Sequence, residues 1–297
     1  MKRIAWALLL LVPILNSAAD EPKDKGLASY VGKDLRFLDE KEAAAFQKRY
    51  ASLTGEKFEF ELGDGLNPWW VKSFGAGKCS WILLQGYPGI QVPDVSYMVI
   101  HAFDKDWKRL AKQEIPTGYR FRLEEVTVSK NDSLNQDLLV AKVICNGPFL
   151  EVEGEKPRPL FEQGDFQRQY YALLDDHFVL VRMEDDKGRL VGNSYCWSKP
   201  VKGPEVPKKS RDEWIRTLSS SNPVEQLATL VWLTGRHLPS GDKREKNINQ
   251  ESVEDSKRFE EVRDAAETKK AIAELANSKN AWVKEYANLP RLAGESK

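Results

Sequence analysis

The chain has little of what most metal and redox sites are made from, with only three cysteines and three histidines among 297 residues. Cys79, Cys145 and Cys196 stand too far apart for the usual zinc-ligand spacings. No histidine lies within a helical turn of another, so no paired-histidine metal motif is present. The sequence therefore predicts neither a resident metal nor any cofactor.

Excess charge of one sign is also lacking, because 45 basic residues balance 45 acidic ones. Proteins that hold nucleic acid or anionic lipid usually carry a basic surplus. Beyond residue 19, no segment is long and apolar enough to cross a bilayer as a helix. We therefore expect no nucleic-acid partner, and no stable membrane insertion once the N-terminal segment has been cleaved.

That N-terminal segment has the three parts of a secretory signal peptide. Lys2 and Arg3 precede an apolar run over residues 4–15, and small residues follow it. The run is short, since a helix needs roughly 20 residues to span the hydrocarbon core. We expect residues 1–19 to be removed before Asp20, and the protein to be exported to the periplasm or the extracellular space. An uncleaved N-terminal anchor is the alternative.

Export would place the cysteines in an oxidising compartment, where they can pair. Three cysteines allow one disulfide among Cys79, Cys145 and Cys196, and the sequence leaves the pairing open. So few cysteines cannot form a disulfide scaffold. The hydrophobic core must therefore supply most of the stability.

The first half of the chain predicts a helix followed by a β-rich domain over residues 38–199. Residues 20–37 are polar and are expected to form a flexible arm. A helix is expected over residues 39–53, where apolar residues recur at helical spacing and Gly55 follows as a stop. Short apolar or alternating runs then indicate strands. These are residues 58–62, 81–84, 97–100, 121–128, 138–145 and 178–183.

The connections between these strands indicate antiparallel pairing. Charged turns are short, whereas parallel strands need long crossovers. Two hairpins, 103–110 and 183–190, look alike when Phe103 is aligned with Met183. The apolar phase of the strand at 121–128 slips by one residue at Glu124-Glu125, which predicts a β-bulge. We expect an antiparallel sheet or sandwich.

The last third of the chain is expected to be helical. Residues 200–209 hold three prolines and three lysines and predict a stiff linker before a helical region at 210–293. Ser210 with Glu213 forms the pattern of a capping box, and Asn222 before Pro223 marks a second helix start. The overall fold class is therefore α+β.

The helical region also contains a faint internal repeat. The first set is Leu218, Asn222, Val224, Ala228, Leu230, Leu233 and Gly235, and it reappears as Leu275, Asn280, Val283, Ala287, Leu289, Leu292 and Gly294. A cap followed by apolar residues at helical spacing resembles HEAT-type helical repeats, although the separation of 57–59 residues exceeds their usual length. The resemblance implies a scaffold that binds other proteins. The alternative is an ordinary helical bundle that packs on the β domain.

Catalytic motifs are absent or incomplete. The stretch Gly75-Ala76-Gly77-Lys78 lacks the first glycine of a phosphate loop, because Lys72 stands there. No Gly-x-Ser-x-Gly elbow is present. The carboxylate pairs Glu124-Glu125, Asp175-Asp176 and Asp185-Asp186, and the thiols of Cys79 and Cys145, are candidates for a hydrolase centre by residue type only.

Tryptophan is the residue type in surplus, with nine in the chain. Trp69-Trp70 follows a loop-like stretch, and Trp107 stands in a charged turn, so these rings are candidates for stacking on sugars. The competing interpretation is that they belong to the core. The leading hypothesis is an exported non-enzymatic protein that binds other proteins. A carbohydrate-binding module that recognises polysaccharide and a hydrolase are the alternatives.

Overall fold

The computed structural model describes residues 27, 40–57, 67–86, 95–119, 121–145, 149–150, 158–159, 166–190, 209–234, 250–289 and 292. Within these ranges the fold is α+β, as the sequence predicts. An N-terminal helix, α1 (Glu40–Thr54), is followed by two four-stranded antiparallel sheets and then by helices. No helix among the described residues is long and apolar enough to cross a membrane.

The strands form two main sheets with simple connections. The first sheet has the order β1-β2-β3-β4, with β1 at Asn67–Ala76, β2 at Cys79–Gly86, β3 at Val95–Phe103 and β4 at Arg109–Tyr119. The second has the order β10-β9-β6-β5, with β5 at Phe121–Asn131, β6 at Gln136–Cys145, β9 at Phe166–Leu174 and β10 at His177–Glu184. A small sheet pairs β7 (Phe149–Leu150) with β8 (Arg158–Pro159).

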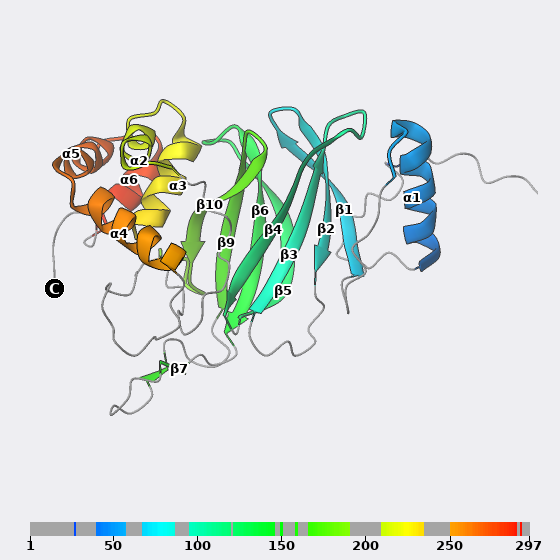
Figure 1. The fold of residues 1–297 in the computed structure, drawn as a ribbon, viewed down its shortest axis with the longest axis horizontal. Helices are drawn as coiled ribbons and strands as arrows, with labels where there is room; N and C mark the ends of the chain where they lie inside the picture. Colours follow the sequence, from blue (N-terminus) through cyan, green and yellow to red (C-terminus); the bar gives the residue numbers. More distant parts are fainter. Residues whose placement is uncertain are drawn as a thin grey trace, which may run out of the picture.

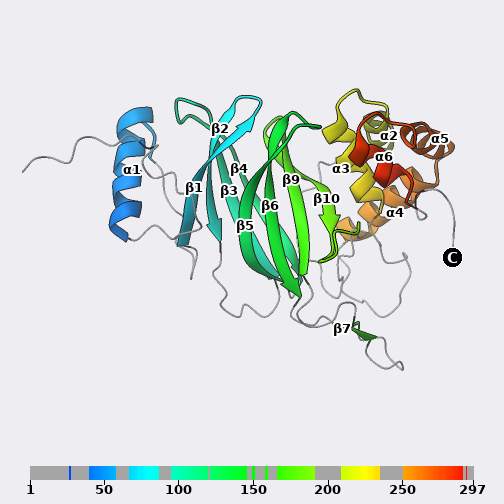
Figure 2. The ribbon, with the colours of Figure 1, turned by 180° about the vertical axis from the view of Figure 1, so that it is seen from behind.

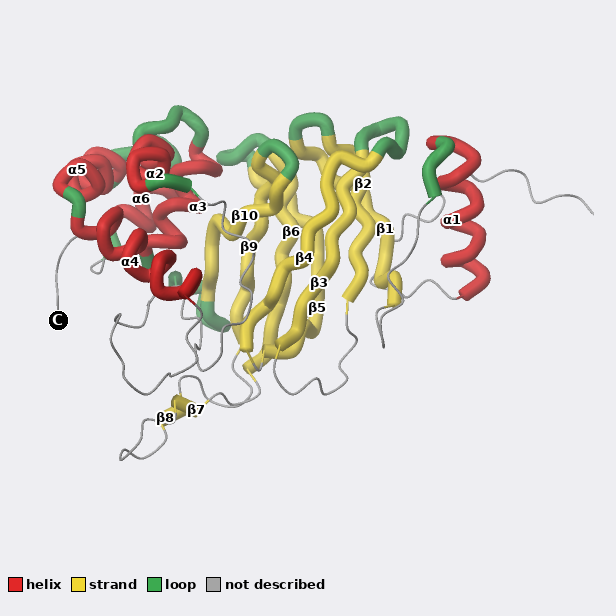
Figure 3. The backbone as a smooth tube through the Cα atoms, in the orientation of Figure 1, coloured by secondary structure: helices red, strands yellow, loops and turns green. Residues whose placement is uncertain are grey.

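The helices after the sheets are short and pack against one another. They are α2 (Arg211–Leu218), α3 (Pro223–Leu233), α4 (Gln250–Asp264), α5 (Ala266–Leu275) and α6 (Ala281–Ala287). We call these five helices the helical unit. Figures 1 and 2 show α1 at one end of the long axis, the strands in the middle and the helical unit at the other end. The tube in Figure 3 shows the same order of helix, sheets and helices.

Three clusters of buried apolar side chains lie between these layers and pack them together. One lies between the sheets and joins residues such as Leu84 and Ile100 of the first sheet to Leu139 and Val143 of the second. Another packs α1 on the outer face of the first sheet. The third packs the helical unit on the outer face of the second sheet. The order along the long axis is therefore helix, sheet, sheet, helices.

This layering explains the continuous apolar runs in the sequence. In β2, Ile82 and Leu84 face the other sheet, whereas Leu83 between them packs under α1. A strand with cover on both faces must be apolar at successive positions. In β6, Leu139 likewise faces the other sheet while Leu138 contacts the helical unit.

Two side chains join the sheets directly. The amide of Gln113 in β4 donates to the carbonyl oxygen of Phe178 at 2.9 Å and accepts from the Phe178 N–H at 2.5 Å, so it extends β10 as a further strand would. On the other side, the carboxylate of Asp137 accepts from the N–H of Gly75 at 2.7 Å. Both side chains link the two sheets, Gln113 through partly buried backbone groups of Phe178 and Asp137 through an exposed N–H.

Several local predictions are confirmed. The bulge lies where the phase slips, because the register of β5 on β6 shifts between Leu123 and Glu125. The N-terminal helix ends at Gly55, which has a positive φ of 71°. Ser210 and Glu213 form a reciprocal capping box, and the side chain of Asn222 caps α3.

The two similar hairpins are real, but the sequence alignment of them is one residue out of step. Asp104 and Asp185 occupy the same place, because each carboxylate accepts two backbone N–H groups of its own turn. The next matched pair is Trp107, with a φ of 66°, and Gly188, with a φ of 73°. Aligning Phe103 with Met183 is therefore wrong, and Phe103 corresponds to Glu184.

The helical unit contains a long stretch of helix over residues 250–275. It is divided into α4 and α5 by Ala265, whose ψ of 136° is extended. The break allows Phe259 and Ile272 to enter the same core from two directions. Several predicted segments lie outside the described residues. They are the signal peptide 1–19, the arm 20–37 apart from Leu27, the strand at 58–62, and the linker 200–209 apart from Lys209.

Candidate functional site

Trp107, a candidate for sugar binding, is a packing residue in this structure. Its side chain is only 6 % exposed. The ring stacks on Trp81 with centroids 5.2 Å apart and meets Phe46 of α1 edge-on at 6.0 Å. Trp69 and Trp70 lie in β1, but their side chains are outside the described residues. The carbohydrate hypothesis therefore depends on Trp69 and Trp70.

Cys79 is a free and buried thiol. Burial raises its pKa to about 11, so the reactive thiolate is scarce at neutral pH. The side chain of Cys145 and the whole of Cys196 lie outside the described residues. The predicted disulfide among the three cysteines stays a prediction, and the free Cys79 has the wrong environment for a nucleophile.

The candidate carboxylates lie in turns and on the surface rather than around one cleft. Asp176 pairs with the neighbouring His177, and Glu124 pairs with Lys142 at 2.7 Å. Burial acts to raise the pKa of Asp185, but hydrogen bonds from the backbone and side chain of Arg189 and from the Lys187 backbone lower it. Such a carboxylate stays ionised and shapes its turn. In the described part of the chain, no group of three or more His, Cys, Asp or Glu side chains could hold a metal ion.

The most elaborate polar cluster lies where β10 meets α6. Arg182 of β10 is 6 % exposed and forms ion pairs with Glu184 of the same strand and, at 2.7 Å, with Glu285 of α6. Burial acts to lower the pKa of Arg182, whereas the hydrogen bonds to Glu285 and Glu184 raise it, so the guanidinium stays charged. We call Arg182, Glu184, Glu285, Tyr170 and Trp282 the junction cluster.

Aromatic rings complete the junction cluster. The guanidinium of Arg182 lies 4.8 Å from the centre of the Trp282 ring, in a cation–π contact. Tyr170 of β9 meets Trp282 edge-on at 5.6 Å and donates its hydroxyl to Glu184 at 2.8 Å. Burial and the bond to Glu184 raise the pKa of Tyr170 to about 12, so this phenol remains a donor. Every charged member thus has a partner of the opposite sign or a ring.

Tyr286 joins α6 to the backbone of β10 beside this cluster. Its hydroxyl accepts the N–H of Met183 at 2.9 Å. β10 is the outer strand of its sheet, so this N–H is one that no neighbouring strand pairs with. The Tyr286 side chain is fully buried, and burial raises its pKa. A helix side chain therefore closes part of the exposed edge of the sheet.

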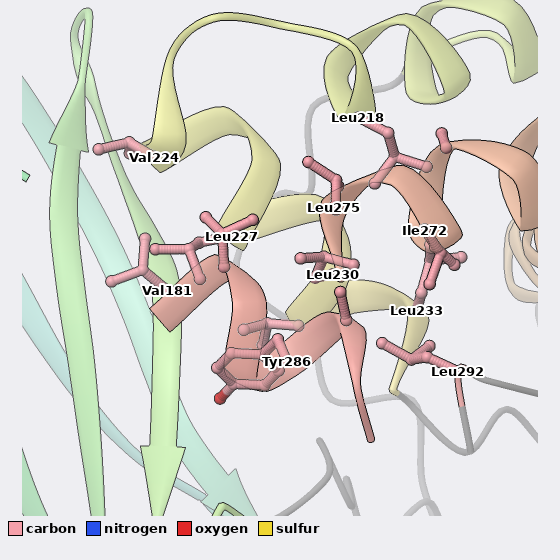
Figure 4. Close-up of a cluster of buried hydrophobic side chains, with 14 of the residues drawn as sticks. Val181, Leu218, Val224, Leu227, Leu230, Leu233, Ile272, Leu275, Tyr286 and Leu292 are labelled. Carbon is pink, nitrogen blue, oxygen red and sulfur yellow. The ribbon is translucent and has the colours of Figure 1, made fainter. Parts of the chain in front are cut away.

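Apolar packing supports these polar contacts. Figure 4 shows Val181 of β10 facing Val224 and Leu227 of α3, with Tyr286 below them in this view. Deeper in the helical unit, Trp214 and Trp232 stack with centroids 4.1 Å apart. Every one of these residues except the half-buried Trp232 is nearly inaccessible to water. The sheet and the helical unit therefore share one core.

The two helix pairs α2–α3 and α5–α6 have the same local geometry. In each, a serine hydroxyl accepts the N–H of the capping asparagine, Ser220 for Asn222 and Ser278 for Asn280. Each asparagine oxygen then accepts the N–H groups that begin the second helix. α2 packs against α5 and α3 packs against α6, so the pairs lie side by side.

Asn280 also makes a contact outside its own helix pair. Among the described residues, Asn222 has no equivalent contact. Its amide donates to the carbonyl oxygen of Ser133 at 3.0 Å, in the turn between β5 and β6. One side chain thus both starts α6 and attaches it to the second sheet. This is a third contact between the helical unit and the β-strands, beside Arg182 and Tyr286.

Sequence reasoning did not identify the residues of this junction. Arg182 had a visible signal, because it is a cation inside the apolar run 178–183 and must therefore find a partner. Glu285 and Tyr286 had none, since they are about a hundred residues away in the chain. Chemically, the junction cluster is saturated with internal partners, so it holds two parts of the protein together.

The chain was compared with known protein families, curated proteins and solved structures. Scans against family models, curated proteins and solved structures found no match for the chain.

Proposed function

We propose that this chain is an exported, non-enzymatic protein that binds another protein through its helical unit. The observation that carries the proposal is the side-by-side packing of α2–α3 on α5–α6, with the same cap geometry in both pairs. Stacked helix pairs of this kind resemble HEAT-type repeats, which present an extended surface to partners. The resemblance is local and rests on these two pairs.

The way in which the helical unit is attached supports this role. A binding surface works best when the body behind it is rigid, because little ordering entropy is then lost on binding. The junction cluster, Tyr286 and Asn280 attach α6 to the second sheet at three places. The β-sheets would therefore act as the rigid base of the binding surface.

The outward positions of the helices indicate a polar contact. Lys270 and Glu274 of α5 and Lys284 of α6 are exposed, whereas the apolar side chains of these helices point inward. Among the described residues, the large hydrophobic side chain that stands exposed is Leu53 of α1. A partner would thus be recognised through charge and hydrogen bonds, which favours a reversible complex.

A capture experiment with matched variants tests this proposal. Residues 20–297 would be immobilised and exposed to the secreted or periplasmic fraction of the native host. We expect a partner whose retention falls about tenfold, equivalent to ~1.4 kcal/mol, in Lys270→Glu/Lys284→Glu. The control is Lys130→Glu/Lys187→Glu, which changes the same charge on exposed β-hairpins. Equal retention by both variants, or no retained protein at all, would refute the proposal.

A carbohydrate-binding module is the second candidate. The tandem Trp69-Trp70 lies at the start of β1, the outer strand of the first sheet, where residues adjoin the rim of the molecule. Tryptophan fluorescence titrated with polysaccharides tests this alternative. A response that disappears in Trp70→Ala but persists in Trp107→Phe, whose ring is buried, would support sugar binding.

A further inference from the structure

Helix α1 packs on the first sheet through two buried aromatic side chains. Phe46 and Tyr50 are buried, and its other described positions are half-buried or exposed. Phe46 meets Trp107 edge-on at 6.0 Å, and Tyr50 meets Phe103 at 5.7 Å. The aromatic side chains of α1 therefore pack on aromatic side chains of the first sheet, which α1 covers.

We call that set the aromatic face, and it consists of Trp81, Phe103 and Trp107 on the outer side of β2, β3 and the turn that follows. Val71 and Leu83 join it at the centre. Trp81 and Trp107 stack with only 4° between their planes. Without α1, this face would expose large apolar surface, which soluble proteins rarely leave open.

A buried histidine lies within the aromatic face. His101 of β3 is 1 % exposed, and its ring stacks on Phe103 with centroids 6.4 Å apart. In the sheet it stands between Leu83 of β2 and Lys112 of β4. It therefore occupies the layer that α1 covers.

The charges around His101 oppose a second positive charge there. β4 contributes Lys112 and Arg109, both cationic and both unfavourable to a protonated imidazole. β2 contributes only the apolar run 81–84. On α1 the charged groups that are half-buried are Glu42 and Arg49, and just after the helix the carboxylate of Glu56 accepts from the Tyr50 hydroxyl at 3.4 Å. Burial and the two cations of β4 therefore disfavour a proton on His101 while α1 covers the ring.

We propose that α1 is a pH-released cover: when α1 opens, acid protonates the uncovered His101, and the protonated ring keeps α1 off the aromatic face. The proposal is independent of partner binding by the helical unit, which lies at the other end of the molecule (Figure 1). The device would make the aromatic face available in acidic surroundings. The covering segment is part of the chain itself.

The direction of the effect follows from the pKa of His101. Burial first, and then Lys112 and Arg109, lower it from 6.5 to about 3 in the covered state. In the open state the ring returns to its ordinary value of about 6.5. The open state therefore binds more protons between these two values, so it is favoured as the pH falls. Between pH 7.5 and pH 5.0 the opening constant should rise about 30-fold.

Hydrogen exchange of the full chain tests the proposal. Protection factors, corrected for the intrinsic exchange rate, would be compared at pH 7.5 and pH 5.0 for peptides of α1 and of α3. We expect the protection of α1 to fall by up to about 30-fold and that of α3 to change less than about threefold. Because carboxylates titrate mostly below pH 5, this window isolates the histidine.

Three variants make the assignment specific. In His101→Phe the ring stacking can persist without a titrating group, so the loss of protection should shrink below about threefold. In Lys112→Glu, at an exposed position, a counter-charge stabilises protonated His101 in the covered state, so the loss should be smaller than in the wild type. His177→Gln changes an exposed histidine and should behave as the wild type does.

The proposal is overturned by any of three results. One is α1 protection that stays constant between pH 7.5 and pH 5.0 in the wild type. Another is a loss of α1 protection in His101→Phe that is as large as in the wild type. The third is a parallel loss in α1 and α3, because that would report general unfolding rather than release of a cover.

Discussion

The two ends of the molecule are covered by helices in opposite ways. At one end, α1 rests on the first sheet through Phe46 and Tyr50. At the other, the helical unit shares a core with the second sheet and adds a buried ion pair at Arg182. A helix held by a few rings can open by itself, whereas a shared core with buried charges opens only with the whole domain. This difference predicts that the second sheet and the helical unit unfold as one cooperative body, and that α1 can detach from the first sheet separately.

The largest expected effect is the loss of Arg182. Arg182→Met leaves the nearly buried Glu184 without its cation, which should lower the free energy of unfolding by about 3 kcal/mol. Chemical denaturation followed by circular dichroism measures it. Arg189→Met removes an exposed ion pair with Asp185 and should cost less than about 1 kcal/mol. Similar costs for both variants would mean that the junction cluster does not hold the two parts together.

A pair of tyrosines compares the two ends with the same chemical change. Tyr286→Phe leaves the buried N–H of Met183 unsatisfied and should cost about 1–3 kcal/mol. Tyr50→Phe removes a long hydroxyl contact to the exposed Glu56, at the rim of the packed helix, and should cost less than about 0.5 kcal/mol. Urea titrations of the two variants test this difference. An equal loss would contradict the contrast between the ends.

The two capping asparagines separate capping from attachment. Asn222→Ala removes a cap and should cost about 1 kcal/mol. Asn280→Ala removes an equivalent cap and also the bond to Ser133, so it should cost about 0.5–1.5 kcal/mol more. Asn280→Asp, which keeps the cap oxygen, should lose only the second part. Thermal unfolding of the three variants measures these differences, and an equal loss in both alanine variants would remove Ser133 from the account.

The smallest effect on global stability is expected from Phe46→Ala. Truncating a buried phenylalanine usually costs about 3–5 kcal/mol. Here the loss cannot exceed the free energy with which α1 is attached. The free energy of global unfolding should therefore fall by less than about 1 kcal/mol. Trypsin should nevertheless cut within α1, at Lys48 or Arg49, much faster than in the wild type. A full-sized loss of stability would show that α1 belongs to the cooperative body.

Local patterns predicted much of the fold. The apolar run 81–84 indicated a strand, and in the structure the other sheet covers one face of that strand and α1 the other. The pairing of Ser210 with Glu213, and the phase slip at Glu124-Glu125, identified a helix start and a bulge. These features are encoded within a few residues, where spacing and capping rules act.

Features that depend on distant contacts escaped prediction. Trp107 stands among charged turn residues, which indicated exposure, but its left-handed backbone turns the ring inward beneath α1. The partners of Arg182 and Met183 on α6 come from 103 residues further along the chain. No spacing rule connects positions so far apart, because only the packing of the helical unit on β10 brings them together.

The most direct test of the account is native-state hydrogen exchange in rising denaturant. We predict that β9, β10, α3 and α6 open together with one free energy of opening, equal to that of global unfolding, and that α1 opens with a lower one. Exchange of α3 and α6 through an opening that leaves β9 and β10 protected would contradict it.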